Sequence, residues 1–166
     1  MLKLNIGSGQ RRLDGWVNCD VQSRPPDQVP DLLFDARGRW PFEDNSADIV
    51  LLHQVYEHFH LSEGRPVLQE AHRVLAPGGR LIVTVPDLRA LCNRWLTRQI
   101  DDYIFCVNLF GGWQGLEGDD HHWAWCRQSL GVEISSAGCW SSVHSYDWKD
   151  LEVVKAWWVL GIEAVK

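Results

Sequence analysis

The sequence predicts an α/β fold: a mostly parallel β-sheet with helices on both faces, a reduced first helix and an antiparallel closing strand. Three observations support this prediction. Short apolar segments alternate with helical patterns, which is typical of parallel sheets. The first apolar segment runs directly into a glycine turn, and the last third of the chain ends in two further strand-like segments. With 166 residues, the chain has the length of a single domain, residues 1–166.

The individual elements follow from hydrophobic periodicity and from turn residues. Strands are expected at 2–6, 16–21, 32–34, 48–52, 80–85, 140–146 and 159–165. Only residues 7–15 separate the first two strands, too few for a crossover helix. Helices are expected at 62–75, 88–104 and 127–137, and a glycine-rich loop at 108–120. We interpret residues 93–126 as a lid-like insertion.

Composition narrows the class of protein and of partner. The net charge of −6 argues against a nucleic-acid substrate, which would favour a basic surface. No apolar run approaches the ~18 residues that a membrane span needs, and residues 1–6 enter a strand without a signal peptide. The five cysteines are odd in number and form no C-x-x-C pair, which favours free thiols in a reducing cytoplasm.

The glycine turn and a following acid predict a pocket for an adenosine-type cofactor. Gly7 and Gly9 let the backbone approach a ligand, and Asp20 at the end of the next strand can accept both hydroxyls of a ribose. A nicotinamide dinucleotide is disfavoured because Arg12 replaces a small residue and Asp20 follows Gly9 by only eleven positions. The phosphate-binding Gly-Lys-Ser/Thr sequence is absent. A cofactor without phosphates therefore fits better.

The motifs resemble those of class I S-adenosylmethionine-dependent methyltransferases, which have a Rossmann-like fold. More narrowly, they resemble a small bacterial group of predicted methyltransferases of type 11. The resemblance rests on L-N-I-G-S-G at 4–9, G-W-V-N-C-D-V at 15–21, D-A at 35–36 and V-Y-E-H at 55–58. It continues with W-P-F at 40–42, D-N-S-A-D at 44–48 and E-A-H-R-V-L-A-P-G-G at 70–79. It is strong over residues 2–87 and looser beyond them.

The resemblance implies S-adenosyl-L-methionine as the cofactor and names the residues that would contact it. Gly7 and Gly9 would lie against the methionine part and the ribose, and Asp20 would hold the ribose hydroxyls. Asp35 and Ala36 would flank the adenine. The full set of implied cofactor contacts is Asn5, Gly7, Ser8, Gly9, Asp20, Val21, Asp35, Ala36 and His53. The chain departs from the family pattern at Asn5, where many relatives carry an acid, and at Arg11, where a third glycine is missing.

Three histidines are the candidates for catalysis, because imidazole suits proton transfer at neutral pH. His53 ends a predicted strand, His58 follows it, and His122 comes after the glycine-rich loop. A metal is a competing interpretation, since some O-methyltransferases bind a divalent ion with Glu-x-x-Glu-His at this place. Here Gln54 replaces the first carboxylate and leaves only Glu57 and His58, so we expect no metal.

The sequence thus predicts a methyltransferase acting on a small-molecule or carbohydrate acceptor, at oxygen. The sugar preference rests on four tryptophans near the insertion, because flat aromatic faces stack on sugars: Trp113, Trp123, Trp125 and Trp140. The alternative is a non-catalytic cofactor-binding or regulatory module on the same fold. Further tryptophans near the end of the sequence leave room for a homodimer.

Overall fold

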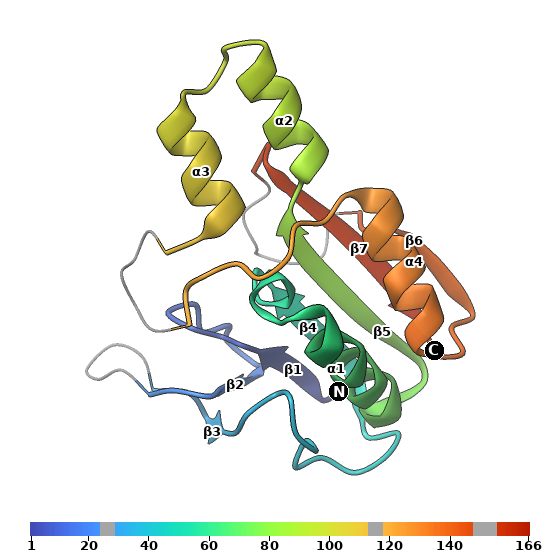
Figure 1. Cartoon of the computed structure of the whole chain (residues 1–166). Coiled ribbons are helices and arrows are strands. Elements are labelled where there is room, and N and C mark those ends of the chain that lie inside the picture. Colours follow the sequence, from blue (N-terminus) through green and yellow to red (C-terminus); the bar gives the residue numbers. More distant parts are fainter. Residues whose placement is uncertain (24–28, 113–117, 148–155) are drawn as a thin grey trace.

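The computed structural model describes residues 1–23, 29–112, 118–147 and 156–166 of the chain, and these form one seven-stranded sheet (Figure 1). The strand order is β3-β2-β1-β4-β5-β7-β6. The strands span Lys3–Ile6 (β1), Val17–Asp20 (β2), Leu32–Leu33 (β3), Ala47–His53 (β4), Leu75–Pro86 (β5), Ser142–Ser145 (β6) and Val159–Val165 (β7). The pattern of short apolar segments therefore located the strands.

Parallel pairing brings the carboxyl ends of the first strands to one edge of the sheet. β1 lies between β2 and β4 and runs parallel to both, with Asn5 opposite Asn18 and Leu51. β4 continues this pattern with β5, whereas β7 pairs antiparallel with β5 and with β6. The predicted α/β fold with an antiparallel closing strand is confirmed.

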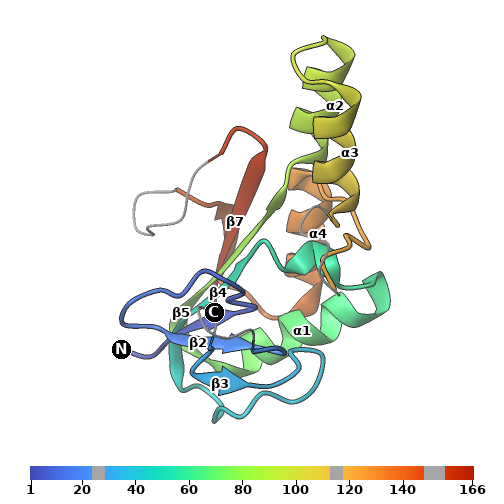
Figure 2. The same cartoon turned by 90° about the vertical axis from the view of Figure 1, so that its left-hand side faces the viewer.

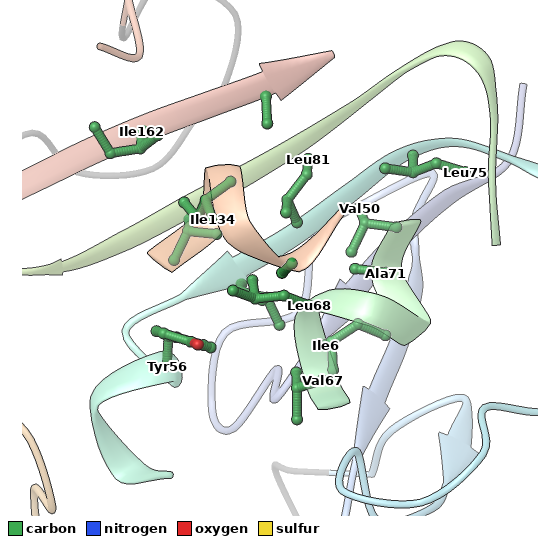
Figure 3. Close-up of a cluster of buried hydrophobic side chains, with 14 of the residues drawn as sticks. Ile6, Val50, Tyr56, Val67, Leu68, Ala71, Leu75, Leu81, Ile134 and Ile162 are labelled. Carbon is green, nitrogen blue, oxygen red and sulfur yellow. The ribbon is translucent and has the colours of Figure 1, made fainter. Parts of the chain in front are cut away.

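Two helices pack on one face of the sheet, α1 (Leu61–Val74) and α4 (Arg127–Ala137) (Figure 2). Their apolar sides join strand residues in a single buried cluster (Figure 3). Val67, Leu68 and Ala71 of α1 are fully buried, as are Leu130 and Ile134 of α4. Burying each such side chain contributes about 1.5–3 kcal/mol, which makes this cluster the main source of stability.

The opposite face of the sheet does not match the prediction that helices cover both faces. In the described ranges, Leu51 and Ile82 of this face are covered by Leu13, Trp16 and Tyr146, which come from loops and not from a helix. The physical reason is the short connection between β1 and β2. As expected, residues 7–15 contain no helix, and they cross the sheet as a loop.

The predicted single helix at 88–104 is wrong, because two helices form there. α2 (Leu88–Leu96) and α3 (Asp102–Phe110) are separated by a turn in which Arg98 has a φ of 58°. Asp101 starts the second helix by accepting a hydrogen bond from the Ile104 N–H at 2.8 Å. The predicted loop from residue 108 therefore begins later, after Gly111 caps α3. Figure 1 shows this helical pair projecting from the sheet edge; a lid role for residues 93–126 stays a prediction.

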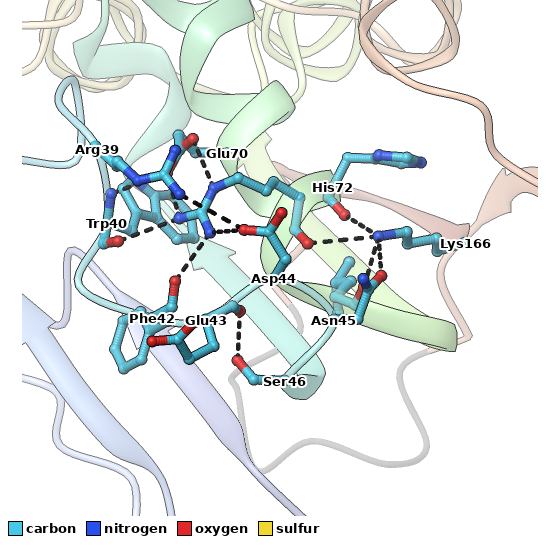
Figure 4. A network of polar contacts seen from close by, with 12 residues as sticks. Arg39, Trp40, Phe42, Glu43, Asp44, Asn45, Ser46, Glu70, His72 and Lys166 are labelled. Carbon is cyan, nitrogen blue, oxygen red and sulfur yellow. Dashed lines mark hydrogen bonds and ion pairs between the residues drawn. The ribbon is translucent and has the colours of Figure 1, made fainter.

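A polar network joins the segment before β4 to α1 and to Lys166 (Figure 4). The Lys166 ammonium donates to the carbonyl oxygens of His72 and Leu75 at 2.7 and 2.8 Å, and to Asn45 Oδ1 at 2.8 Å. A cation at this position satisfies carbonyls at the C-terminal end of α1 that have no partner within the helix. None of the helices in the described ranges is long and apolar enough to cross a membrane.

Candidate active site

A cavity of about 530 Å³ opens at the edge where β1, β2 and β4 end. Ligands of open parallel sheets bind beyond the carboxyl ends of the strands, so this is the place expected for a cofactor. Its volume falls within the range of about 300–1,000 Å³ usual for small-molecule sites. The lining includes six residues that the sequence analysis named for cofactor contact: Gly7, Gly9, Asp20, Val21, Asp35 and Ala36.

Asp20 holds the glycine turn in place. Its two carboxylate oxygens accept hydrogen bonds from the backbone N–H groups of Gly9, at 2.7 Å, and Gln22, at 3.0 Å. Each carboxylate oxygen can accept further bonds, so Asp20 can serve a ligand while it orders the turn. This second role was not foreseen from the sequence.

Gly7 lies where only a glycine fits. Its φ is +68°, a region that side chains disfavour, and an added Cβ would stand 2.3 Å from Cγ2 of Val55. Val55 itself lines the cavity. The turn after β1 and the segment after β4 are thus packed against each other beside the cavity.

Asp35 is paired with a residue that the sequence analysis did not consider. The Arg37 guanidinium donates to both Asp35 oxygens, at 2.7 to 3.0 Å, and this bonding lowers the pKa of Asp35 despite partial burial. Arg37 also reaches Glu63 Oε1 at 3.4 Å and lines the cavity. The Arg37 guanidinium, held between Asp35 and Glu63, therefore places a positive charge at the end of the cavity where the adenine is expected.

Three of the expected cofactor residues lie outside this cavity. Asn5, Ser8 and His53 line a separate space of about 30 Å³ behind the glycine turn. The Asn5 amide donates to the Arg11 carbonyl oxygen at 3.0 Å and to Asn18 Oδ1 at 2.9 Å. Alternation along β1 explains this placement, because Asn5 points to the face opposite Leu4 and Ile6. Direct cofactor contact by these three residues stays a prediction.

Both ring nitrogens of His53 are engaged. Arg11 Nη1 lies 3.3 Å from Nε2, and since a guanidinium can only donate, Nε2 accepts and Nδ1–H donates to Thr84 Oγ1 at 2.7 Å. Burial, reinforced by the Arg11 charge, lowers the pKa of His53 to about 4. His53 is therefore neutral at pH 7, and its catalytic role stays a prediction.

His58 and His122 line the cavity. Backbone and ring contacts that the sequence could not reveal bring their two segments together. The 3₁₀ turn Tyr56–His58 after β4 carries Glu57, whose carbonyl oxygen accepts from the N–H groups of His122 and Trp123 at 2.8 and 3.2 Å. These bonds dock the segment after α3 onto the turn. His122 stacks on His60 with ring centroids 3.9 Å apart.

The Glu57 side chain is completely enclosed. It is 1% exposed, and neither carboxylate oxygen has a hydrogen-bond partner among the described residues. Burial raises the pKa of Glu57 to about 8. Nearby, burial lowers the pKa of His58 and brings that of His121 to about 4. His121 was not among the three histidines chosen as catalytic candidates, and because 62 residues separate it from His58, no spacing along the chain links the two.

The tryptophans that were predicted to gather around the insertion lie in different environments. Trp123 is 45% exposed, whereas Trp125 is 4% exposed and packs against Tyr56 with ring centroids 5.4 Å apart. Trp140 packs edge-on against His72 on the far side of α1. Trp113 lies outside the described residues. Only Trp123 of the described tryptophans in this group presents an open ring close to the candidate histidines.

Comparisons with known proteins agree with this architecture. A family model described as a methyltransferase domain matches residues 17–83. No curated protein sequence matches the chain. Among solved structures, a Thermotoga maritima SAM-dependent methyltransferase, described as a possible histamine N-methyltransferase, is similar with a TM-score of 0.64 and 18% identity. That match covers 99% of this chain and 82% of the other.

Two further structures share the fold. A SAM-dependent methyltransferase from Archaeoglobus fulgidus has a TM-score of 0.64 at 14% identity, over 99% of this chain and 85% of that one. The 1,6-didemethyltoxoflavin-N1-methyltransferase of Burkholderia thailandensis, solved with S-adenosylhomocysteine, has a TM-score of 0.61 at 14% identity, over 99% and 70%. The chain is therefore similar to a methyltransferase domain over residues 17–83 and shares the fold of solved S-adenosylmethionine-dependent methyltransferases.

Proposed function

We propose that this chain binds S-adenosyl-L-methionine in the 530 Å³ cavity and transfers its methyl group to a hydroxyl of a small-molecule or carbohydrate acceptor. The observation that carries the proposal is the position of Asp20. Its carboxylate lines the cavity at the end of β2 and is fixed there by the N–H groups of Gly9 and Gln22. A preorganised carboxylate at this edge is the group that a ribose requires.

The remaining lining fits the other parts of the cofactor. Gly7 and Gly9 leave backbone accessible beside the methionine portion, and Ala36 offers a small apolar surface to the adenine. Asp35, held by Arg37, presents carboxylate oxygens that can accept from the adenine amino group. The Burkholderia relative was solved with S-adenosylhomocysteine, the demethylated form of the same cofactor.

Methyl transfer is an in-line displacement, so alignment of acceptor oxygen, methyl carbon and sulfur supplies much of the catalysis. The sulfonium is already activated, and the chain's own residues bind and orient the reactants. We assign the proton-accepting role to His122, which lines the cavity beside His58. The exposed ring of Trp123, next along the chain, can stack on the apolar face of a sugar.

Calorimetric titration tests the pocket. Replacing Asp20 with alanine is expected to weaken binding of S-adenosylhomocysteine by about 1.5–3 kcal/mol, the scale of hydrogen bonds to a charged group, which is roughly 10- to 150-fold in Kd. Asp14→Ala is the matched control, because Asp14 is an exposed acid of the neighbouring loop between β1 and β2 and lies outside the cavity lining.

Two results would contradict the proposal. One is unchanged affinity in a folded Asp20→Ala protein, and the other is equal weakening in the Asp14→Ala control. If wild-type protein binds neither S-adenosylmethionine nor its product at millimolar concentration, the alternative of a non-catalytic module replaces it. If the wild type does bind the cofactor, a mass-spectrometric search for a 14-dalton increase across hydroxylated sugars would identify the acceptor class.

A further inference from the structure

Glu57, His58 and His121 form a compact cluster of metal-ligating groups beside the cofactor cavity. One potential ligand atom from each residue lies within 4.8 Å of the other two. The residues come from two separate segments, the turn after β4 and the segment after α3. We propose that these three side chains bind a divalent transition-metal ion of the Zn²⁺ class, with an open coordination position facing the cavity.

The first argument is the state of the Glu57 carboxylate. Only 1% of Glu57 is exposed, and in the part of the chain that the structure describes neither of its carboxylate oxygens has a hydrogen-bond partner. A buried carboxylate without a partner is costly, and native structures rarely leave one in that state. A cation between the two imidazoles and Glu57 would satisfy it.

The second argument is the orientation of the histidines. His58 Nδ1 lies 3.1 Å from the carbonyl oxygen of Asp120, so Nδ1–H donates there and Nε2 keeps its lone pair. The His121 ring lies edge-on to the His58 ring, at an interplanar angle of 81°. Histidines that bind metals characteristically give their other N–H to a backbone carbonyl or a carboxylate, which fixes the tautomer and the ring direction.

The backbone holds His121 in register with the turn. Its N–H donates to the Phe110 carbonyl oxygen at 2.8 Å, next to a bridge between Gly111 and Asp120. A Cβ on Gly111 would stand 2.7 Å from the His121 ring, so glycine is required for this approach. The ring centroids of His58 and His121 are 4.8 Å apart.

The donor set decides which metal fits. Two imidazoles and one carboxylate suit Zn²⁺, Co²⁺ or Ni²⁺, whereas Mg²⁺ and Ca²⁺ prefer oxygen ligands alone. With Zn–N and Zn–O distances of about 2.0–2.2 Å, tetrahedral donors sit about 3.4 Å apart, so the cluster closes slightly around the ion. Three protein ligands leave a fourth position open, and one of the three, His58, lines the cavity.

The sequence argued against a metal because Gln54 replaces a carboxylate. The structure supplies the third ligand from His121 instead, which no local pattern could reveal. The inference does not depend on the proposed methyl transfer, since metal binding can be measured with no cofactor present.

Metal titration of the full chain tests the proposal. Protein freed of its affinity tag, treated with EDTA and desalted, would be titrated with ZnCl₂ by calorimetry and with CoCl₂ by visible absorption. We expect one equivalent per chain, and affinity lowered at least tenfold in Glu57→Gln and in His121→Asn. His122→Asn is the matched control, because it removes the neighbouring histidine from outside the cluster and should change the affinity by less than threefold.

Folding is checked separately, by circular dichroism of each variant and by thermal unfolding of wild-type protein with ZnCl₂ or MgCl₂. ZnCl₂ should raise the Tm of the wild type and MgCl₂ should not. The proposal is overturned if the wild type takes up neither Zn²⁺ nor Co²⁺ and its Tm is unchanged. It is also overturned if folded Glu57→Gln and His121→Asn bind as the wild type does, or if His122→Asn loses as much as they do.

Discussion

Some residues beside the candidate site tolerate no larger side chain, and Gly7 is the most constrained of them. A Cβ there would meet Val55 Cγ2 at 2.3 Å, and φ is +68°. We predict that Gly7→Ala lowers the free energy of unfolding by about 1–2 kcal/mol for the left-handed backbone and by a further ~1–3 kcal/mol for overpacking. Urea unfolding measures the loss.

Gly15 provides the control, because its φ is +74° and no atom of the described ranges lies within 4 Å of an added Cβ. Gly15→Ala should therefore show the backbone cost alone. Adding Val55→Ala to Gly7→Ala should recover part of the overpacking, so the two effects should be non-additive. Equal losses in Gly7→Ala and Gly15→Ala would mean that the contact with Val55 is unimportant.

His53 gives a prediction about pH. Because burial and Arg11 lower its pKa to about 4 in the folded protein, the unfolded chain binds a proton first as pH falls below about 6.5. The stability that neutral His53 contributes is complete above about pH 6.5 and is lost as pH falls toward 4. His53 contributes at most about 1.4 kcal/mol per pH unit to the change of the free energy of unfolding with pH.

NMR titration of the imidazole resonances measures this directly. The His53 midpoint should fall near pH 4, and the free energy of unfolding of His53→Asn should depend less steeply on pH between 6.5 and 4.5 than that of the wild type. A His53 midpoint above pH 6 would contradict the assignment. Comparison with the variant is needed because His58 and His121 also have lowered pKa values.

Sequence reasoning reached the candidate site unevenly. Asp20 was named from its place at the end of a strand and Asp35 from the family resemblance, and the structure places both at the cavity. Arg37 was not named, and the association of His121 with Glu57 and His58 was missed. Their importance comes from contacts with Asp35 and with Glu57 and His58, and no spacing along the chain encodes a contact made through the fold.

At the level of elements, hydrophobic periodicity predicted the strands better than it predicted the interruptions in helices. Residues 88–104 are apolar enough to suggest one helix, but Asp101 caps a new helix and Arg98 takes a left-handed turn. β5 begins at Leu75, five residues before the expected start, because Ala47 pairs with Leu75 across a register shift. Cap and bulge positions depend on such tertiary pairings.

The α2–α3 pair shows another limit of local pattern. The apolar side chains of a helix are expected to be buried, yet Tyr103 is 70% exposed, Phe110 61% and Leu96 73%. No residue of α3 is buried. The sequence therefore specifies that these helices form, through Asp87 and Asp101 as caps, but it does not specify what their apolar side chains contact.

Across the whole molecule, Arg73 joins segments distant in sequence. All five of its N–H donors are used: Glu70 takes two, at 2.9 and 2.7 Å, and Asp44, the Phe42 carbonyl and the Trp40 carbonyl take one each, at 2.6, 2.9 and 3.1 Å. The side chain of Arg73 is 15% exposed and that of Glu70 19%. Bonding to Asp44 and Glu70 lowers the pKa of both acids and raises that of Arg73.

Removing this guanidinium should therefore destabilise the whole fold. We predict that Arg73→Ala lowers the free energy of unfolding by about 2–4 kcal/mol, because it leaves the half-buried Glu70 charge and two carbonyl groups without their donor. Arg39→Ala is the matched control, since Arg39 is 73% exposed and its ion pair is with Asp44, at 3.6 Å, where an exposed pair contributes less than about 1 kcal/mol. Urea unfolding followed by tryptophan fluorescence measures both. If the two variants lose the same stability, the segment before β4 is held to α1 by apolar packing and not by Arg73.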